Sequence, residues 1–454
     1  MTHELFSGYD IRGVVGRDIG ARFAEDLGKA FATFLGKPGK PVLVARDNRT
    51  HSPMLQLAFE QGLRSRGFGV VELGMAPTPL MQYALAKGGS AGGCIVTASH
   101  NPPEYNGFKL YRGRMTLSSE EMLRLSRIFH AKAFPKRAKS GGLAKLDYSQ
   151  AYVSDILRRG RPARRLKVAI DAGNGVCGPL ARRLFEGMGC KVTMLFEDTE
   201  SAFLNHVPDP HDPANMRWLQ DEVLSQKADL GIAFDGDGDR AGFVDDKGRI
   251  VREDDAFVLL MRGLKPEKRG AVVCDLRLSM AVREEAERLG LRPVVSKAGR
   301  IAIREELLKR KAAFGGEVSG HYFFKEHYGF DDGMYAAFKM CMWLSAQQLP
   351  AAEIVDGIRH YPATPEMRVH TDTKRETVDA VKKSLRKRFG GKLKTIDGAY
   401  LDLGDSWGLV RVSNTEPAVT LRFEGRTKPA LRKVVGIFKK ELEAAGGRLP
   451  PVRY

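Results

Sequence analysis

Apolar, β-branched runs alternate along this chain with stretches whose apolar residues recur at helical spacing. Such alternation is typical of α/β proteins with parallel or mixed sheets. We expect strands at Val42–Ala45, Val70–Leu73, Cys94–Thr97, Val168–Asp171, Val192–Phe196, Leu230–Phe234, Val272–Cys274 and Val294–Val295. We expect helices at Asp18–Leu35, Pro53–Arg66, Leu180–Met188 and Met280–Leu289.

Three breaks interrupt this pattern at roughly regular distances. Lys136–Lys145 is basic and contains Ser-Gly-Gly, Asp245–Gly248 is a turn cluster, and Tyr361–Pro365 holds two prolines. The breaks predict four domains, at 1–145, 146–247, 248–361 and 362–454. The last segment begins with a predicted strand, Met367–Thr371, and ends with a predicted helix, Pro429–Ala445. We therefore expect three mixed α/β domains followed by a smaller α+β domain.

The composition is that of a folded protein without a membrane span. Hydrophobic residues make up 43% and charged residues 28% of the 454 positions, which favours several buried cores over disorder. No stretch reaches the roughly 20 apolar residues that cross a bilayer, and no secretory signal precedes Arg12. Five scattered cysteines without a C-x-x-C pair predict neither a disulfide framework nor a zinc site. We therefore expect a cytoplasmic protein.

The chain is basic, with 73 Lys and Arg against 55 Asp and Glu and a formal net charge of +18. Such a charge attracts anions, either nucleic acid or a small phosphate ester. The basic residues are spread out, with modest clusters at Arg158–Arg165 and Lys382–Lys394, and no nucleic-acid-binding motif accompanies them. A solvated basic surface is the simpler interpretation, and nucleic acid is not the partner that we expect.

The first motif with chemical potential is Thr-Ala-Ser-His-Asn-Pro, at Thr97–Pro102. It follows an apolar strand, and small and polar residues before Asn-Pro favour a tight, exposed loop. In such a loop Ser99, with His100 beside it, could be a nucleophile or a phosphate carrier. An ordinary turn is the alternative.

The second motif is Asp-Gly-Asp-Gly-Asp-Arg, which spans 235–240 after another apolar strand. Asp235, Asp237 and Asp239 can converge on one hard cation, because the glycines let the backbone curl round the ion. An EF-hand loop is excluded, since Arg240 stands where that loop needs glycine. Three clustered carboxylates would repel one another without a cation. The motif therefore predicts a metal site, which an anion joins through Arg240.

The third motif, Gly315–His321, carries Glu317, Ser319 and His321 at alternating positions. In an extended loop these three side chains would face one side. Glutamate can accept hydrogen bonds from sugar hydroxyls, and serine and histidine can donate them. The alternative is a glycine turn between two strands.

The fourth motif, Arg411–Pro417, is followed by Arg422. Two arginines, two hydroxyls, an amide and the backbone N–H groups of a turn could form a phosphate cradle. A hairpin loop with polar capping residues is the alternative. A further anion site is possible at Ser296–Arg300, between a predicted strand and a predicted helix.

The order and spacing of these motifs resemble the α-D-phosphohexomutase family over nearly the whole chain. Within it they are most similar to the bacterial phosphomannomutase/phosphoglucomutase subgroup. The residues that carry the resemblance are Tyr9–Gly13, Thr97–Pro102, Asp235–Arg240, Gly316–His321, Arg411–Pro417, Phe323–Glu326 and Gly329–Gly333. The resemblance implies four domains around a central cleft. It also implies an isomerase that interconverts hexose 1-phosphate and hexose 6-phosphate through a phosphoserine and a 1,6-bisphosphate intermediate.

The resemblance assigns roles to individual residues. Ser99 matches the family's phosphoserine. The Mg²⁺ ligands of the family are matched by Asp235, Asp237 and Asp239 together with Ser99. Positions around the transferring phosphate are matched by Arg12, His100, Lys109, Arg240 and His321. Sugar-hydroxyl contacts are matched by Glu317 and Ser319, and contacts to the other phosphate by Arg411, Ser413, Asn414, Thr415 and Arg422. Further substrate-binding candidates are Tyr9, Lys297, Gly299 and Arg300. The general base and acid stay open among His321, Lys109 and His100.

The resemblance further implies a hexose 1,6-bisphosphate activator, a phosphosugar substrate, no membrane partner, and a monomer or weak homodimer. Arg300 departs from several relatives, which have histidine there. Val318 stands where phosphoglucosamine mutases usually have glutamine, so we expect mannose or glucose as the sugar. The alternatives are a phosphoglucosamine mutase, a nucleic-acid-binding protein and a sugar-phosphate sensor without activity.

Overall fold

The computed structural model describes residues 4–6, 8–135, 139–264, 270–413, 418–447 and 449. The chain forms two compact units. The first unit contains residues 1–266 and 319–356, and the second contains 267–318 and 357–454. Each unit is therefore assembled from two separate stretches of sequence.

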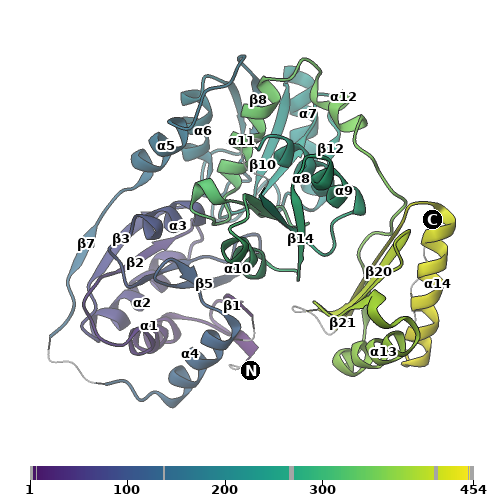
Figure 1. Cartoon of the computed structure of the whole chain (residues 1–454). Coiled ribbons are helices and arrows are strands. Elements are labelled where there is room, and N and C mark those ends of the chain that lie inside the picture. Colours follow the sequence, from purple (N-terminus) through teal and green to yellow (C-terminus); the bar gives the residue numbers. More distant parts are fainter. Residues whose placement is uncertain are drawn as a thin grey trace. The chain divides into compact units, whose positions relative to one another are not determined.

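A seven-stranded mixed sheet organises the N-terminal part of the first unit, in the order β1-β5-β4-β2-β3-β7, with β6 paired to β5. Its strands are β1 (Ile11–Val14), β2 (Val42–Arg46), β3 (Val70–Met75), β4 (Gly92–Val96), β5 (Tyr105–Arg112), β6 (Met115–Thr116) and β7 (Leu143–Lys145). Its helices are η1 (Glu4–Phe6), α1 (Ala21–Leu35), α2 (Ser52–Arg64), α3 (Thr78–Lys87) and α4 (Ser119–Ala131). Helix α3 lies on the opposite face of the sheet from α1 and α2 (Figure 1).

Aromatic side chains fill the space between this sheet and helices α1, α2 and α4. Phe59 of α2 lies 6.1 Å from Phe31 of α1 and 5.8 Å from Phe108 of β5, measured between ring centroids, and all three are buried. Strands β2 and β4 are parallel neighbours, so the loops that follow them leave the sheet at the same edge. This edge carries Ser99.

A second mixed sheet of the first unit has the order β12-β11-β10-β8-β9. Its strands are β8 (Lys167–Asp171), β9 (Lys191–Leu195), β10 (Leu230–Phe234), β11 (Ala241–Val244) and β12 (Ile250–Val251). The remaining elements of the unit are α5 (Ser149–Leu157), α6 (Gly178–Gly187), η2 (Pro213–Met216), α7 (Arg217–Gln226), α8 (Glu253–Arg262), β16 (Tyr322–Phe324), η3 (Lys325–His327), α11 (Gly333–Ser345) and α12 (Ala351–Asp356). The acidic motif is the tight connection between β10 and its antiparallel partner β11. As predicted, Asp245–Gly248 is a turn, closed by the hydrogen bond from Gly248 N to Asp245 O.

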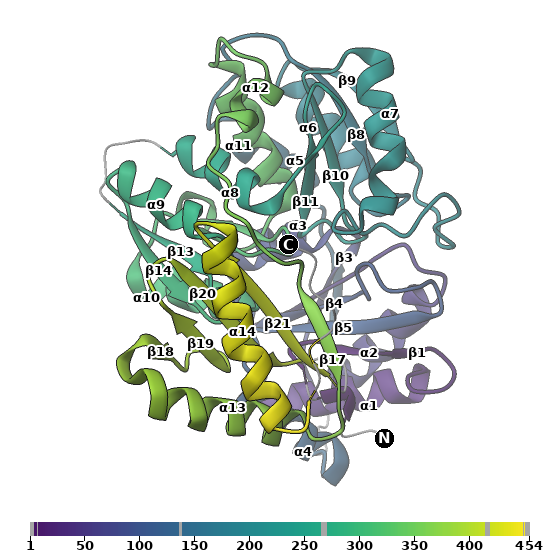
Figure 2. The same cartoon turned by 90° about the vertical axis from the view of Figure 1, so that its right-hand side faces the viewer.

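The second unit combines a parallel arrangement, β14-β13-β15, with an antiparallel sheet of order β17-β21-β20-β19-β18. The elements around the parallel strands are β13 (Ala271–Asp275), α9 (Met280–Arg288), β14 (Arg292–Ser296), α10 (Arg300–Arg310) and β15 (Phe314–Gly316). The C-terminal elements are β17 (Met367–His370), α13 (Lys374–Phe389), η4 (Gly390–Lys392), β18 (Leu393–Lys394), β19 (Ala399–Asp402), β20 (Ser406–Val412), β21 (Ala418–Gly425) and α14 (Lys428–Ala444). Helix α14 lies across β20 and β21 (Figure 2), where Phe438 packs against Phe423 at 5.2 Å.

The predicted fold class is confirmed: α/β sheets precede a smaller C-terminal α+β arrangement. Every strand and helix predicted from periodicity is present, with ends that differ by at most three residues. Helix α1 starts later than predicted because Asp18 turns back and accepts a hydrogen bond from Val14 N at 2.9 Å. The predicted break at Lys136–Lys145 is wrong in one part. Residues 143–145 form β7, since their backbone groups pair with the open edge of β3.

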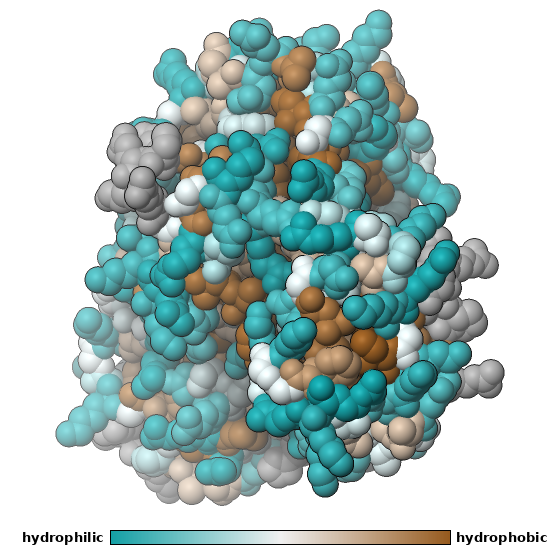
Figure 3. Space-filling view, turned by 45° about the vertical axis from the view of Figure 1, so that its right-hand side comes forward, coloured by the Kyte–Doolittle hydropathy of each residue, from teal (hydrophilic) through white to brown (hydrophobic). Residues whose placement is uncertain are grey.

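The excess basic charge lies partly on exposed helical surface. Lys383, Arg386 and Lys387 of α13 are all exposed, which fits the simpler interpretation of a solvated basic surface. Hydrophilic residues predominate on the face shown in Figure 3, with hydrophobic areas between them. Among the described helices, none combines the length and the hydropathy that a membrane span requires.

Candidate active site

Ser99 lies in the loop after β4 and is held in a backbone conformation that few non-glycine residues adopt. Its φ is +53°, in the left-handed region. Its N–H donates to Thr97 Oγ1 at 2.9 Å, and its hydroxyl donates to Asp235 Oδ2 at 2.6 Å. The side chain is 3% exposed. The loop therefore aims the serine hydroxyl into the acidic motif, as the phosphoserine prediction requires.

The acidic loop gathers three buried carboxylates behind Ser99. Asp235, Asp237 and Asp239 each offer an oxygen, and these oxygens lie within 4.8 Å of one another. Gly236 permits this approach, because a Cβ there would lie 2.4 Å from the carbonyl oxygen of Ser99. The predicted cluster of aspartates is therefore present, and the glycine beside it brings the serine loop into contact with it.

Two buried cations face these carboxylates. Lys109 of β5 donates from Nζ to Asp237 Oδ2 and Asp239 Oδ2, at 2.6 Å in both cases. Arg240 donates from Nε to Asp235 Oδ2 at 3.1 Å. Burial of unpaired charges is costly, and two cations against three carboxylates leave a net negative cluster.

The residues present fit a divalent cation. Oxygen donors in a compact, charged set are what Mg²⁺ prefers. Asp237 Oδ1 is buried and has no hydrogen-bond partner among the described residues, so this oxygen could coordinate a cation. Asp235 and Asp239 supply the other two carboxylates. Thr78, at the start of α3, orients Asp237 by donating from Oγ1 to Oδ2 at 2.6 Å and from N to the carbonyl oxygen at 2.8 Å.

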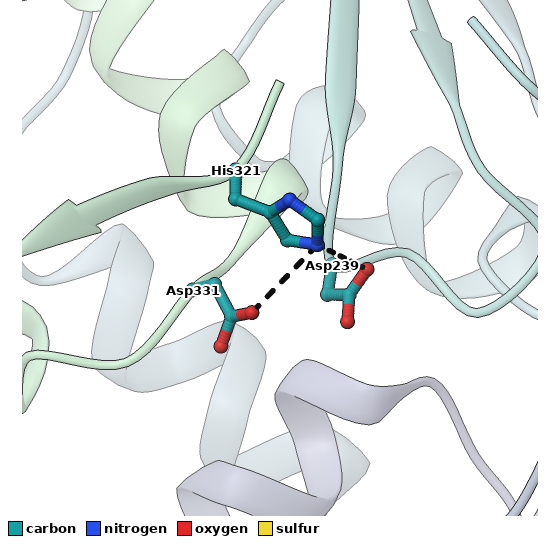
Figure 4. Close-up of side chains that lie close together, drawn as sticks. All are labelled: Asp239, His321 and Asp331. Atoms are coloured by element: carbon teal, nitrogen blue, oxygen red, sulfur yellow. Dashed lines mark ion pairs between the residues drawn. The ribbon is translucent and has the colours of Figure 1, made fainter. Parts of the chain in front are cut away.

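His321 comes from the later stretch of the first unit and approaches the same loop. Its Nε2 lies 3.3 Å from Asp239 Oδ1 and 3.9 Å from Asp331 Oδ2 (Figure 4). Its Nδ1 lies 2.9 Å from Ser319 Oγ. A backbone bridge between His321 and Arg240 brings this segment to the acidic loop. The imidazole is therefore positioned between two carboxylates and one hydroxyl.

His100 and Arg12 flank the serine. His100 Nδ1 lies 3.1 Å from Ser99 Oγ and is also contacted by Arg240 Nη2. Burial, reinforced by the charges of Arg240 and Arg12, lowers the pKa of His100 well below its ordinary value, so this imidazole is neutral at working pH. Arg12 of β1 donates to Asn101 Oδ1 at 2.5 Å, on the loop that carries the serine.

Asp235 is the carboxylate whose protonation is most affected by the site. Burial, assisted by Asp239 and Asp237 and opposed by Arg240, raises the pKa of Asp235 to about 7. A carboxyl group with that pKa is half protonated near neutral pH without a metal. A proton and a cation therefore compete for the same oxygen atoms.

We expect the affinity for Mg²⁺ to rise between about pH 6 and pH 7 and to level off above pH 7. Below its folded-state pKa of about 7, Asp235 must release a proton before it can bind the ion, so the affinity should change by about one logarithmic unit per pH unit. Titration calorimetry at three pH values, in two buffers of different ionisation enthalpy, measures both the affinity and the released proton. An affinity that does not vary with pH would contradict this assignment.

In the second unit, Glu317 lies beside the Lys297–Arg300 segment. Its Oε2 accepts a hydrogen bond from Gly299 N at 2.9 Å, and Arg277 Nη2 lies 3.9 Å away. Arg277 is fixed in turn by Asp275 at 2.5 Å. An anion site was predicted at this segment. In the structure the Gly299 N–H donates to the carboxylate of Glu317, which belongs to the same unit. Lys297 and Arg300 flank this contact along the chain.

The third motif is not extended as predicted. Residues 318 and 319 form a turn, and Gly320 adopts a φ of +80°, which reverses the chain. Ser319 and His321 do lie on one side, as their 2.9 Å contact shows. The turn therefore places Ser319 and His321 on the same side, which was expected to result from an extended backbone.

The fourth motif is described in part. Arg411 pairs with Asp397 Oδ2 at 2.9 Å, and Ser413 accepts a hydrogen bond from Lys374 at its carbonyl oxygen, at 2.9 Å. Arg422 of β21 lies diagonally across from Arg411 of β20, because Thr420 is the direct partner of Arg411. The two arginines therefore share one face of the sheet. Asn414 and Thr415 lie outside the described residues.

Sequence reasoning missed several residues that support the site. Thr78 and Asp331 contact it directly, Arg277 holds Glu317, and Arg49 lies under the serine loop. A signal for Arg49 was present, since Asp-Asn-Arg-Thr follows the apolar strand at Val42 just as the two recognised motifs follow theirs. Thr78 begins a helix and Arg277 lies in a turn, where no local pattern marks them, whereas Asp331 belongs to the Gly329–Gly333 segment of the resemblance, in which it was given no role.

Four family profiles match the chain in succession. They are the alpha/beta/alpha domains I, II and III of phosphoglucomutase/phosphomannomutase, at 3–136, 148–248 and 252–361, and the C-terminal domain, at 366–440. The chain belongs to the phosphoglucomutase/phosphomannomutase family. The predicted resemblance is therefore confirmed.

Individual members of the phosphoglucomutase/phosphomannomutase family match over nearly their full length. A phosphomannomutase/phosphoglucomutase of Pseudomonas aeruginosa is 35% identical over 98% of this chain and 97% of its own. A phosphoglucomutase of Neisseria meningitidis is 34% identical, with 98% of both chains covered. The crystal structure of a family member from Burkholderia thailandensis has a TM-score of 0.91, at 34% identity and 99% coverage of both chains.

Proposed function

We propose that this chain is an isomerase that interconverts hexose 1-phosphates and hexose 6-phosphates of glucose, mannose or both. The curated relatives named above carry phosphoglucomutase or phosphomannomutase/phosphoglucomutase as their names, which supports this reaction class. The structural observation that carries the proposal is the 2.6 Å approach of Ser99 Oγ to Asp235 inside the acidic loop. A serine in that place can carry a phosphoryl group only with a cation beside it.

The electrostatics of the loop support a phosphoryl carrier that works with Mg²⁺. A phosphoryl group on Ser99 would add about two negative charges next to Asp235. When bound, Mg²⁺ neutralises such charge and polarises the phosphoryl oxygens. Arg240 and Lys109 add fixed positive charge in the same buried site, where electrostatic stabilisation is strongest. Phosphoryl transfer depends mainly on such neutralisation and alignment.

The transfer conserves the phosphoryl group. The bond between Ser99 Oγ and phosphorus breaks while a hexose hydroxyl oxygen forms a bond to the same phosphorus, and the hydroxyl proton goes to a base. The leaving Ser99 Oγ takes up a proton, so the products are a 1,6-bisphosphate and a free serine hydroxyl. After the bisphosphate has turned round, Ser99 Oγ loses its proton and bonds to the other phosphorus, the bond between that phosphorus and the hexose oxygen breaks, and this oxygen takes up a proton, so that the enzyme ends as it began.

Among the three candidates for proton transfer, we favour His321. Lys109 is held by two carboxylates at 2.6 Å, and neutral His100 has Nδ1 engaged by Arg240. His321 has Nε2 beside Asp239 at 3.3 Å, on the same acidic loop that Ser99 contacts. A general base must lie within hydrogen-bond reach of the reacting hydroxyl.

We assign the hexose and its second phosphate to residues of the second unit. Glu317 would accept hydrogen bonds from sugar hydroxyls. Arg411 and Arg422, which share one face of their sheet, would hold the phosphate that is not transferred, and Ser413 would contribute a hydroxyl. Tyr9, Lys297, Arg300, Asn414 and Thr415 remain candidates for substrate contacts. A hexose 1,6-bisphosphate would activate the enzyme by placing the first phosphoryl group on Ser99.

A substrate panel tests this function. Glucose, mannose and glucosamine 1-phosphates are compared by kcat/KM at fixed Mg²⁺, after activation by glucose 1,6-bisphosphate. We expect turnover of glucose or mannose 1-phosphate to exceed that of the glucosamine compound, since buried Val318 cannot hydrogen-bond an amino group. A preference for glucosamine 1-phosphate would favour the alternative phosphoglucosamine mutase. Absence of turnover with all three would refute the mutase proposal.

Replacing Glu317 with glutamine should lower kcat/KM by about 10- to 100-fold, the equivalent of one hydrogen bond to a charged group. The amide keeps the shape of the side chain but halves its accepting capacity beside Gly299 and Arg277. Steady-state kinetics with glucose 1-phosphate measures the effect. Glu306→Gln is the control, because among the described residues Glu306 of α10 pairs only with Lys309 and Arg310, so this variant should leave kcat/KM unchanged. Equal kinetics for Glu317→Gln and wild type would count against a sugar contact.

A further inference from the structure

Arg49 is a fully buried arginine in the loop after β2, and its exposed fraction is 0%. Asp47 neutralises it locally, since Asp47 Oδ2 accepts from Arg49 Nε at 3.2 Å and Asp47 Oδ1 accepts from the backbone N at 3.0 Å. Ser52 Oγ also donates to Asp47, at 2.5 Å. A buried ion pair that is this well bonded is fixed in place.

The far end of the guanidinium holds the backbone of the serine loop. Nη2 donates to Ser99 O at 2.9 Å and to Asn101 O at 2.6 Å. Nη1 donates to Pro102 O at 2.6 Å and to Tyr105 O at 3.0 Å. Together with Nε, these contacts use all five N–H donors of one arginine. Three carbonyl oxygens of the serine loop and that of Tyr105, the first residue of β5, are thus tied to one rigid, planar group.

The serine loop needs such an external support. Ser99 has a φ of +53°, a conformation that persists in a non-glycine residue only when its surroundings hold it. Within its own loop the Ser99 backbone makes one hydrogen bond, which its N–H donates to Thr97 Oγ1. The carbonyl oxygen of Ser99 is bonded to Arg49, so the arginine acts on the peptide that sets the direction of the hydroxyl.

Phe203, in the connection between β9 and η2, covers the Arg49 guanidinium with its aromatic ring. The guanidinium carbon lies 5.0 Å from the ring centroid, within the range of a cation–π contact. Phe203 is 7% exposed. Because water is kept away, the hydrogen bonds of Arg49 are stronger than at a surface.

We infer that Arg49 is a positioning residue for the phosphoryl carrier: its guanidinium fixes the Ser99 loop so that the hydroxyl points at the acidic loop. This inference rests on the proposed function of Ser99. None of the contacts that involve Arg49 uses a group assigned to the hexose or its second phosphate. Its loss should therefore slow phosphoryl transfer without weakening substrate binding, because a displacement of about 1 Å can cost on the order of 10²-fold in rate.

The test uses Arg49→Lys, which keeps the positive charge beside Asp47 but replaces the five-donor fork with three donors on one atom. We expect kcat with glucose 1-phosphate to fall about 10²-fold, KM to stay near the wild-type value, and the unfolding midpoint to change little. Arg49→Ala should lose kcat likewise and recover part of it in millimolar guanidinium, but not in urea. Arg249→Lys is the matched control, since Arg249 also holds two carboxylates and a carbonyl, far from Ser99 in sequence and without a contact to its loop. It should keep wild-type kinetics.

Hydrogen exchange of the same proteins gives a result that does not depend on turnover. Residues 99–105 should exchange faster in Arg49→Lys than in wild type, with other segments unchanged. Unchanged exchange in this loop overturns the inference, as does an unchanged kcat, or a kcat that falls only in step with the unfolding midpoint. If wild type and Arg249→Lys both lack mutase activity while the loop exchanges faster in Arg49→Lys, the proposed function fails and the positioning of the loop by Arg49 stands.

Discussion

Ser99→Ala is expected to lower kcat for glucose 1-phosphate by on the order of 10⁴-fold or more, as loss of a covalent nucleophile does in other enzymes. The hydroxyl that donates to Asp235 at 2.6 Å is the only group that the variant removes. No other side chain of the site offers a hydroxyl to Asp235 among the described contacts. Metal binding by the aspartates should be retained, so the variant should lose phosphoryl transfer alone.

Ser99→Gly separates chemistry from backbone strain. Glycine accepts a φ of +53° without penalty, so this variant should fold at least as well as wild type and still be inactive. Mass spectrometry after incubation with glucose 1,6-bisphosphate should show one added phosphoryl group in wild type and none in either variant. Ser154→Ala, on α5, removes a hydroxyl that among the described residues accepts a hydrogen bond only from Gln150, so this variant should be phosphorylated and active. Full activity of Ser99→Gly would end the phosphoserine proposal.

Asp237→Asn should weaken Mg²⁺ binding by more than the roughly 10- to 100-fold that loss of a supporting outer residue costs. The amide keeps the hydrogen bond from Thr78 but removes a full negative charge from the set of three. It also leaves Lys109 with one carboxylate partner instead of two. Charge and geometry at the metal are therefore both impaired.

Thermal unfolding with increasing Mg²⁺ measures this effect without any turnover. A ligand that binds the folded state raises the unfolding midpoint, so wild type should be stabilised at Mg²⁺ concentrations that leave Asp237→Asn unaffected. Asp229→Asn is a suitable control, because Asp229 pairs with Arg164 at the surface and should not alter the titration. Identical titrations for wild type and Asp237→Asn would show that the acidic loop has a structural role only.

Hydrophobic periodicity predicted the fold well because these sheets are largely buried. Leu230–Phe234 is buried at every position, and its apolar run ends where the acidic motif begins, so both ends of the strand could be predicted from the sequence. Strand β7 could not be predicted in this way, since all three of its residues are exposed. Its pairing with β3 is a matter of backbone hydrogen bonds that leave no apolar pattern.

The candidate site likewise contains residues that the local sequence marks and contacts that depend on the order of the strands. Ser99, Asp235, Asp237 and Asp239 stand in short loops after apolar strands, where composition alone marks them. Arg49 also stands in a short loop after an apolar strand, but its local pattern does not show which groups it holds, since these depend on β2 and β4 being parallel neighbours whose loops meet at one edge. That neighbour relation follows from strand order, which periodicity does not contain.

The sequence by itself determined the α/β class, the acidic motif and the serine loop, because these depend on residues close together in the chain. The tertiary structure decided which distant groups meet them. Thr78 reaches Asp237, Lys109 bridges two aspartates, and Arg49 holds the serine loop only because sheet order and helix packing bring separate segments to one edge. Such contacts depend on the closure of the whole fold, so local spacing could not reveal them.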